Sequence, residues 1–404
     1  MGLPALAVSA WIALAASTLG NMVLAVAVVN RLQSRRMRRH TLHLFVPLQY
    51  PAMIALPLAI LWIASAAGRH PSAVPLHVTA PLHATALWHL LPWPLAGYAA
   101  ACLVVGLVTP LVGFWRVFGP PPAIQTGFSS QKLCMVQRMG RRPVAAVGKH
   151  WLTRLPGNEV LSLEITEKRF RLPGLPVALN GFSVLHISDL HFTGTLDRGY
   201  YEQIVDLCND LKPELVAFTG DLLDRLQLVD WLPETLGRLN APCGRFFVLG
   251  NHDWDIGPTE PTRLALKNLG WVDLAGRVQT VDVRGQQVTL CGTEVPWMGA
   301  LPELPPAVAG SEPALRVLLS HSPDCIGWAK QHDIGLMLAG HVHGGQIRLP
   351  LFGPVYSPSA YGGHYASGAF WEAPTLLHVS RGVAGDVPLR WNCMPEITRI
   401  VLEA

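Results

Sequence analysis

The segment LAGHVHGGQ, residues 338–346, places two histidines one residue apart among three glycines, directly after an apolar run. Beyond the end of a strand, a glycine-rich loop lets His341 and His343 converge on one point. Imidazole is the commonest metal ligand in proteins, and flanking glycines let the backbone approach an ion. The segment indicates a metal site. A histidine pair in a loop is more often only exposed, so further ligands are needed to support this interpretation.

Four other segments share the pattern of a short apolar run that ends in polar side chains. They are SVLHISDLH (183–191), ELVAFTGDLLD (214–224), RFFVLGNHD (245–253) and LRVLLSHSPD (315–324). Each apolar run is typical of a buried strand. Independent strands are not expected to end in this way five times in order. We therefore interpret the polar side chains as one set of ligands: Asp189, His191, Asp221, Asn251, His321, His341 and His343.

This ligand set suits two metal ions. Two carboxylates, four histidines and one amide oxygen exceed what one ion with an open position takes, and Asp221 is a candidate bridge. Oxygen and nitrogen donors without thiolate favour manganese, iron or zinc, and the seven scattered cysteines form no CxxC motif. Two ions about 3.5 to 4 Å apart bind phosphoryl oxygens and activate water, so the predicted chemistry is hydrolysis of a phosphate bond.

The ligands require a sheet that gathers the ends of its strands. Between the first two strands, the segment YYEQIVDLCNDL (200–211) has apolar residues at helical spacing, which predicts a helix. Strand, helix and strand in succession predict an α/β sheet, which binds ligands at the carboxyl ends of its strands. The pattern begins near residue 156, so we expect a catalytic domain over 156–404.

The ordered segments DLH, GDLLD, GNHD, SH and GHVH resemble the signature of the calcineurin-like metallophosphoesterases, and the resemblance covers about 183 to 382. The ending SRGVAGDVPLRWNCMPEITRI is similar to the membrane-associated bacterial branch of that family. The resemblance implies a metallophosphoesterase-type β-sandwich flanked by helices. It also implies that one ion is held by Asp189, His191, Asp221 and His343, and the other by Asp221, Asn251, His321 and His341.

The resemblance further implies roles for two residues that bind no metal. His252 stands where the family has a histidine that protonates or stabilises the leaving oxygen, and Asp224 where a carboxylate orients that histidine. A nearby carboxylate restores the proton affinity that an imidazole loses beside two cations. Asp253 is the alternative orienting group.

The first third of the chain is far more apolar. Residues 4–30 contain no charge, and 27 helical residues span about 40 Å, more than the roughly 30 Å of a hydrocarbon core. Two further apolar runs, 43–67 and 87–115, contain prolines, which membrane helices tolerate when neighbouring helices satisfy the freed carbonyls. We expect about three helices in a transmembrane region over 1–115. One span with a buried helical hairpin is the alternative.

Basic residues predict the orientation of this region. Five arginines follow the first run and a basic stretch follows the third, whereas the loop between the second and third has only Arg69. The positive-inside rule therefore predicts a multi-pass protein of the cytoplasmic (inner) membrane with its catalytic domain inside. We expect residues 116–155 to form a basic linker or an arm along the membrane surface. Topology and anionic headgroups explain these charges, so no nucleic-acid partner is expected.

Together these features predict a membrane-anchored dinuclear phosphohydrolase. A membrane-held site favours a lipid-linked substrate, because anchoring raises the effective concentration of the enzyme near it. Relatives implied by the resemblance include enzymes that hydrolyse the pyrophosphate of UDP-diacylglucosamine, so a phosphodiester or pyrophosphate bond is expected. The alternative is a non-catalytic binding scaffold on the same fold. Such a scaffold is free to lose metal ligands, and this sequence has lost none.

We predict that alkaline phosphatase fused at Ala404 is inactive and that a fluorescent protein fused there is fluorescent, because three crossings place this end in the cytoplasm. Both fusions are measured in whole cells. Pro92 and Pro94 weaken the start of the third run, and its failure to cross would leave an even number of crossings. Active alkaline phosphatase at Ala404 would place the catalytic domain outside and exclude a nucleotide-linked substrate.

Overall fold

The computed structural model describes residues 8–69, 93–304, 314–350 and 352–404. The chain divides into two compact units, each with a hydrophobic core of its own. The smaller unit comprises Met1–Gln33, Met37–Gly119 and Pro350–Gly353, and the larger unit comprises Ser34–Arg36, Pro120–Leu349 and Pro354–Ala404.

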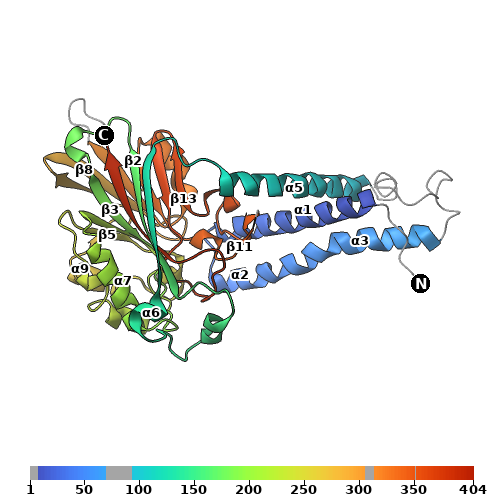
Figure 1. The fold of residues 1–404 in the computed structure, drawn as a ribbon, viewed down its shortest axis with the longest axis horizontal. Helices are drawn as coiled ribbons and strands as arrows, with labels where there is room; N and C mark the ends of the chain where they lie inside the picture. Colours follow the sequence, from blue (N-terminus) through green and yellow to red (C-terminus); the bar gives the residue numbers. More distant parts are fainter. Residues whose placement is uncertain (1–7, 70–92, 305–313, 351) are drawn as a thin grey trace. The chain divides into compact units, whose positions relative to one another are not determined.

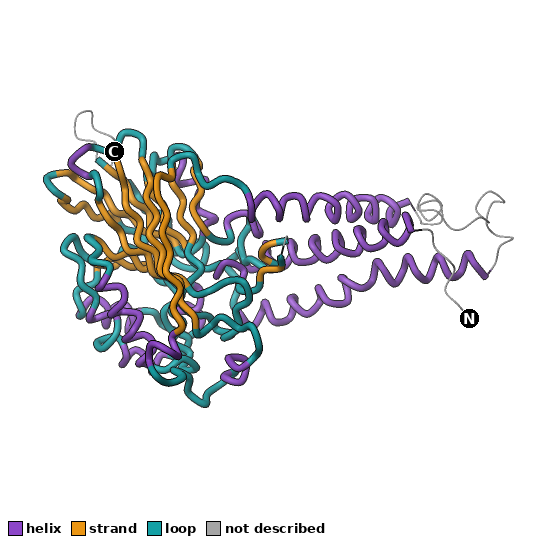
Figure 2. The backbone as a smooth tube through the Cα atoms, in the orientation of Figure 1, coloured by secondary structure: helices purple, strands orange, loops and turns teal. Residues whose placement is uncertain are grey.

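Long helices form the smaller unit (Figure 2). They are α1 (Val8–Gln33), α3 (Gln49–Arg69) and α5 (Trp93–Phe118), with α2 (Arg39–Phe45) and the 3-10 turn η1 (Val46–Leu48) between the first two. α1 packs against both α3 and α5. At the crossing with α5, a Cβ on Gly20 would lie 1.7 Å from the carbonyl oxygen of Cys102, so only glycine permits this close approach.

One asparagine joins the three helices. Pro57 has no N–H to donate to the carbonyl of Met53, four residues earlier in α3. Asn21 of α1 donates to this carbonyl at 2.8 Å and to that of Ala52 at 2.9 Å. The hydroxyl of Tyr98 on α5 donates in turn to Asn21 Oδ1 at 2.7 Å. The carbonyl that the proline leaves open is therefore satisfied from a neighbouring helix, as an apolar surrounding requires.

Two of the described helices are long and apolar enough to cross a membrane, over Trp11–Gln33 and Trp93–Trp115. Most of their side chains are not buried within the protein, unlike those of a core helix. The expected span over 43–67 differs, because the apolar stretch found there, Val46–Ile60, falls short of a hydrocarbon core of about 30 Å at ~1.5 Å per residue, although α3 itself continues to Arg69. The loop between the second and third apolar runs, from residue 70 onward, lies outside the described residues, as do residues 87–92 of the third expected span. The described residues thus support two crossings, where the sequence predicts three.

Two sheets form the larger unit (Figure 1). The seven-stranded sheet has the order β1-β2-β15-β3-β4-β5-β6. Its strands are β1 (Gln125–Cys134), β2 (Ser162–Arg171), β15 (Glu396–Glu403), β3 (Phe182–Ile187), β4 (Leu215–Thr219), β5 (Arg245–Val248) and β6 (Val272–Asp273). β3 to β6 run parallel to one another, so the carboxyl ends of β3, β4 and β5 meet at one edge.

The second sheet has six strands in the order β13-β14-β10-β9-β8-β7. They are β13 (Gly368–Glu372), β14 (Thr375–Val379), β10 (Leu336–Ala339), β9 (Leu315–Ser320), β8 (Gln286–Thr293) and β7 (Val278–Val283). β9 and β10 are parallel neighbours at its centre. Apolar side chains of both sheets meet in one buried core, among them Val184, Leu290 and Leu338.

Helices cover the outer faces of the two sheets. α7 (Arg198–Asp210) and α9 (Glu260–Asn268) bury Tyr200, Ile204 and Leu266 against the seven-stranded sheet. α10 (Ile326–Gln331) buries Ile326 and Ala329 against the other sheet. This arrangement confirms the predicted β-sandwich flanked by helices, with apolar helices at the N-terminal side of the sequence.

An edge strand lies within the stretch that the sequence predicts to be a linker, 116–155. β1 pairs antiparallel with β2 from Gln125↔Phe170 to Cys134↔Ser162, and residues from Pro120 onward belong to the larger unit. Most β1 side chains are exposed, so the strand lacks the alternation by which a half-buried strand is recognised. Backbone hydrogen bonds therefore order this segment without a signal in its side chains.

A buried polar network connects the two sheets. Lys168 Nζ of β2 lies 2.7 Å from Glu396 Oε1 of β15 and 2.9 Å from His378 Nε2 of β14. His378 Nδ1 lies 2.8 Å from His186 Nδ1 of β3. Burial alone would raise the pKa of Glu396, but Lys168 and Arg381 hold it well below its ordinary value. The carboxylate therefore stays charged inside the protein and neutralises the buried ammonium.

We predict that Glu396→Ala lowers the free energy of unfolding by about 3 to 5 kcal/mol, because it leaves the buried Lys168 ammonium without its carboxylate. The measurement is chemical unfolding of the detergent-solubilised chain, followed by tryptophan fluorescence. Lys330→Ala is the control. It breaks an exposed ion pair with Glu372 and should cost less than about 1 kcal/mol. Equal, small losses in the two variants would show that the network does not stabilise the fold.

Candidate metal centre

The predicted ligands follow the carboxyl ends of parallel strands in both sheets. Asp189 and His191 come after β3, and Asp221 after β4. Asn251 begins α8 (Asn251–Asp255), just beyond β5. The remaining ligands belong to the other sheet and come after β9 and β10: His321, His341 and His343. Because both sheets place these ends at a common edge, side chains from five segments of the chain converge.

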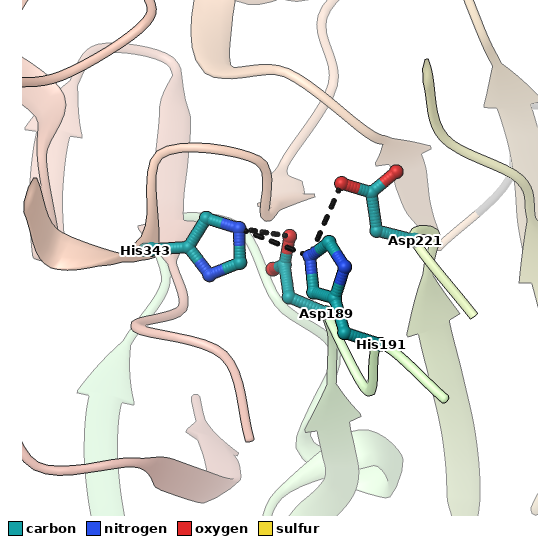
Figure 3. Close-up of side chains that lie close together, drawn as sticks. All are labelled: Asp189, His191, Asp221 and His343. Atoms are coloured by element: carbon teal, nitrogen blue, oxygen red, sulfur yellow. Dashed lines mark hydrogen bonds and ion pairs between the residues drawn. The ribbon is translucent and has the colours of Figure 1, made fainter. Parts of the chain in front are cut away.

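Four of these side chains form a first cluster (Figure 3). The figure shows Asp189, His191, Asp221 and His343 with their polar atoms directed toward one another, and one ligand atom from each lies within 4.8 Å of the others. His343 Nε2 is 3.5 Å from Asp189 Oδ1 and 3.2 Å from His191 Nε2. His191 Nε2 is 3.5 Å from Asp221 Oδ2. Two imidazoles and two carboxylates can enclose one ion here.

Asp221 also belongs to a second cluster. Its Oδ1 lies 3.3 Å from His321 Nε2, which is 3.1 Å from Asn251 Oδ1. Atoms of Asp221, His321 and His341 again lie within 4.8 Å of one another. The structure thus brings together all seven side chains that the sequence singles out, in two groups that share one carboxylate.

The backbone of the ligands is unusual. Positive φ values between 43° and 72° occur at Asp189, His191, Asp221, His341 and His343. This region is costly for residues other than glycine, and such strain concentrates at functional sites. Space is equally limited, since a Cβ on Gly250 would lie 2.1 Å from Asp221 Oδ1. The loops are therefore shaped to direct side chains inward at a cost in backbone energy.

Burial and neighbouring charges set the protonation of the clusters. Burial alone would raise the pKa of Asp221, but His321 and its other histidine neighbours hold it well below its ordinary value. Burial lowers the pKa of His341 to about 3, so this ring is neutral, as a metal ligand must be. Burial also opposes protonation of His321, but Asp221 outweighs it and raises the pKa to about 9. Binding of a cation at His321 therefore releases a proton.

Hydrogen bonds between these side chains leave two of their polar atoms unsatisfied, and metal ions would satisfy them. Among the described residues, Asp221 Oδ2 and His341 Nε2 are buried without a hydrogen-bond partner. An unsatisfied buried polar atom costs about 1 to 3 kcal/mol, more when charged. Both atoms belong to the clusters and are oxygen and nitrogen donors suited to divalent transition metals. A dinuclear centre would satisfy both.

A third group of side chains stands beside the first cluster. Asp224 accepts two contacts: its Oδ2 lies 2.8 Å from His191 Nδ1, and its Oδ1 lies 2.7 Å from His252 Nδ1. Asp253, the alternative partner for His252, instead accepts hydrogen bonds from the backbone N–H groups of Gly250 and Leu223, at 2.9 and 3.0 Å. The geometry therefore pairs His252 with Asp224 and assigns Asp253 to holding the loop.

Two residues that the sequence analysis missed support the ligands from behind. The ring of Trp297, which is 2% exposed, packs on His341 with centroids 4.6 Å apart. Arg390, which is 1% exposed, places Nη2 3.4 Å from His343 Nδ1 and donates from Nη1 to the carbonyl of Arg381 at 2.7 Å. Neither follows a strand of the ligand pattern, so no signal of that kind marks them in the sequence.

Known proteins are similar to this chain over the region that contains the site. The sequence profile of the calcineurin-like phosphoesterases matches residues 182–345. The phosphodiesterase YaeI of Escherichia coli is 31% identical over 226 residues, which cover 55% of this chain and 82% of that protein. The uncharacterized metallophosphoesterase YkuE of Bacillus subtilis is 29% identical over 248 residues, 60% and 86% of the two chains. The UDP-2,3-diacylglucosamine pyrophosphatase LpxG of Chlamydia muridarum is 27% identical over 303 residues, 61% and 90%.

The chain belongs to the calcineurin-like phosphoesterase family. The resemblance inferred from the five motifs is thereby confirmed, and with it the class of enzyme, a metal-dependent phosphoesterase. The matched residues include both clusters, from Asp189 to His343. The family uses a dinuclear metal centre, which agrees with two clusters that share a carboxylate.

We predict that the purified protein contains close to two transition-metal ions per chain, because seven ligand-type side chains converge. Asp221→Asn should reduce the content below one ion, since both clusters lose the shared carboxylate. Metal affinity should rise with pH below about 9, where His321 loses its proton. Metal analysis by mass spectrometry measures these values.

Asp206→Asn is the control, because Asp206 forms a half-exposed ion pair with Arg238 and should leave the metal content unchanged. One tightly bound ion in the unaltered chain, with no activity gained on metal addition, would contradict a dinuclear centre.

Proposed function

We propose that this protein is a membrane-anchored phosphohydrolase that uses two divalent ions, of manganese, iron or zinc, to cleave a phosphodiester or pyrophosphate bond. The supporting observation is that Asp221 belongs to both clusters. Within each cluster, one ligand atom from every residue lies within 4.8 Å of the others. When bound, two ions so placed stabilise the phosphoryl oxygens and activate the attacking water. In this assignment the ligands are Asp189, His191, Asp221, Asn251, His321, His341 and His343.

His252 acts in this proposal as the general acid. Its side chain is 18% exposed beside the buried clusters, so a substrate can reach the ring. Asp224 holds Nδ1 at 2.7 Å, which directs the other edge of the ring away from the carboxylate and favours the protonated form. The backbone N–H of His252 donates to Asp221 Oδ1 at 2.9 Å, so the acid is positioned by the same carboxylate that joins the clusters. Protonation of the leaving oxygen contributes about 10² to 10⁴-fold to the rate.

A lipid-linked substrate is the class we favour. LpxG, a relative that this chain covers over 90% of its length, acts on UDP-2,3-diacylglucosamine by its name, and YaeI is named a phosphodiesterase. The two apolar helices hold the catalytic unit near a bilayer, where lipid-bearing substrates are concentrated. The same arrangement offers no feature that selects nucleic acid, so no nucleic-acid partner is proposed.

We further propose that α3 is a third crossing and that the catalytic unit is cytoplasmic. α3 has 21 residues, about 31 Å at ~1.5 Å per residue, and its sequence is apolar apart from its ends. A third crossing places both basic flanks on one side, as the positive-inside rule favours. The three proposed domains are then a transmembrane region over 1–115, a connecting segment over 116–155, whose residues from Pro120 onward pack with the catalytic unit, and a catalytic domain over 156–404.

The proposed reaction is tested with the purified full chain in detergent. Bis-p-nitrophenyl phosphate, p-nitrophenyl phosphate and UDP-diacylglucosamine separate diester, monoester and pyrophosphate cleavage. We expect hydrolysis of the diester or the pyrophosphate, abolished by a chelator and restored by manganese or zinc. Two bound ions with no hydrolysis of any of the three would favour a non-catalytic binding scaffold on the same fold.

In the same assay, His252→Ala should lower kcat by roughly 10² to 10⁴-fold and leave the metal content nearly intact, because the ring protonates the leaving group and binds no ion. Asp253→Asn is the matched carboxylate control for Asp224→Asn. Only the latter removes the partner of His252, which lowers the proton affinity of the ring and should shift the alkaline limb of the pH profile to lower pH. Loss of metal in His252→Ala would make this residue a ligand instead.

A further inference from the structure

Charge is divided unequally along the chain. No aspartate or glutamate occurs before Glu159, so all 27 acidic residues lie in the rest of the sequence. Part of the basic excess belongs to the catalytic unit, because residues from Pro120 onward are part of it. We call residues 135–158 the basic arm. It contains five cationic side chains, from Arg138, Arg141, Arg142, Lys149 and Arg154.

The basic arm exposes apolar side chains beside these charges. Trp151 lies in the 3-10 helix η4 (His150–Arg154) and is 58% exposed, and the next residue after η4, Leu155, is 39% exposed. Arg154 is exposed at the end of η4. A second exposed indole adjoins the arm, since a Cβ on Gly157 would lie 3.8 Å from Trp391 Nε1, and Trp391 is 49% exposed. Aromatic, aliphatic and cationic groups thus share one short stretch of surface.

Hydrogen bonds attach the arm to the catalytic unit. Asn158 Nδ2 donates to the carbonyls of Leu152 and Pro388, each at 2.8 Å, and Asn158 Oδ1 accepts from the backbone N–H of Arg390 at 3.0 Å. Arg142 Nη2 donates to the carbonyl of Thr153 at 2.9 Å. The exposure of the two indoles is therefore built into an ordered segment. Indole and leucine side chains beside cations are the composition that settles at the boundary of headgroups and acyl chains.

We propose that the basic arm docks on an anionic bilayer surface. Arg141 and Lys149 form ion pairs with Asp197 and Asp386, and the remaining charge of Arg138, Arg142 and Arg154 is complementary to anionic headgroups. The exposed indole and leucine of the arm fit the layer beneath the headgroups. Nucleic acid would match the charge but would leave Leu155 in water, so the bilayer is the better partner. This inference rests on the proposed membrane anchoring and is independent of the bond that the enzyme cleaves.

The chain length between α5 and β1 makes this contact available. Six residues separate Phe118, the end of α5, from Gln125, the start of β1, and they reach at most about 20 Å. β1 then covers ten residues, about 33 Å at ~3.3 Å per residue, before the arm begins. Residues 119–124, which tether the catalytic unit to α5, and the basic arm are thus at opposite ends of β1. A tether alone permits rotation of the catalytic unit, whereas a second contact at this separation restrains its orientation.

The docking surface adjoins the ligand loop of the metal centre. Trp391 directly follows Arg390, whose Nη2 lies 3.4 Å from His343 Nδ1. Asn392 Nδ2 donates to the carbonyl of Arg348, in the segment that leaves the His343 loop. The docking surface and the ligand loop are therefore parts of one hydrogen-bonded region.

The test uses the full chain in lipid nanodiscs, of phosphatidylcholine alone or with added phosphatidylglycerol. A spin label is placed at Leu155→Cys, with the exposed Cys134 replaced by serine. Accessibility to oxygen, which partitions into lipid, is compared with accessibility to a water-soluble nickel chelate. We expect phosphatidylglycerol to increase the first and decrease the second several-fold. A label at Val177→Cys, which is 83% exposed in the same unit, should not respond.

Charge reversal completes the test. Arg154→Glu should return the Leu155 label to water and raise KM several-fold for a lipid-bearing substrate, while hydrolysis of bis-p-nitrophenyl phosphate in detergent stays unchanged. Arg277→Glu, at another exposed arginine of the unit, should do neither. A label equally exposed to water in both bilayers overturns the docking, as does protection by added RNA in place of lipid. Absence of hydrolysis in every variant contradicts the proposed reaction. The spin-label measurement still tests the docking of the basic arm in that case, because it does not depend on hydrolysis.

Discussion

The shared carboxylate of Asp221 is the constraint on which the rest of the catalytic unit depends. It is buried, lies 3.5 Å from His191 in one cluster and 3.3 Å from His321 in the other, and accepts the backbone N–H of His252. A carboxylate in this position is tolerable only when cations neutralise it, because burial of an unpaired charge is expensive. Protonated histidine supplies that charge in part, and two divalent ions supply it fully. Without metal, the buried negative charge of Asp221 is therefore only partly neutralised.

Much of the surrounding structure serves to hold side chains against that site. Five ligands adopt left-handed backbone conformations, which a flexible loop would relax, so their surroundings must enforce them. Trp297 packs on His341, the carbonyl of Thr219 contacts His321 Nδ1 at 2.7 Å, and Arg390 stands behind His343. Beneath these residues, the Lys168 and Glu396 network joins the two sheets whose edges carry the ligands. Rigid sheets and charged buried contacts together hold the side chains of the two clusters in place.

The apolar helices and the basic arm give this hydrolase a location as well as a chemistry. In the smaller unit, Asn21 donates to the carbonyl that Pro57 leaves without a donor, as a helix in an apolar surrounding requires. In the larger unit, exposed indoles and cations gather close to the ligand loop of His343. An enzyme held near lipid gains most when its substrate is itself a lipid, which agrees with the proposed substrate class.

The sequence by itself singled out the seven side chains that the structure brings together, and its motifs identified the family and, through that resemblance, the β-sandwich class. Each ligand follows an apolar strand, and parallel strands bring their carboxyl ends to one edge, so local patterns were sufficient. Only the tertiary structure decided that Asp224 and not Asp253 meets His252, because Asp253 is the neighbour in sequence but backbone N–H groups occupy its carboxylate, whereas Asp224 comes from a loop 28 residues earlier. The same holds for β1, whose exposed side chains carry no strand signal, and for Trp297 and Arg390. Their roles arise from contacts between segments far apart in the chain, and such contacts do not produce a periodic pattern in the sequence.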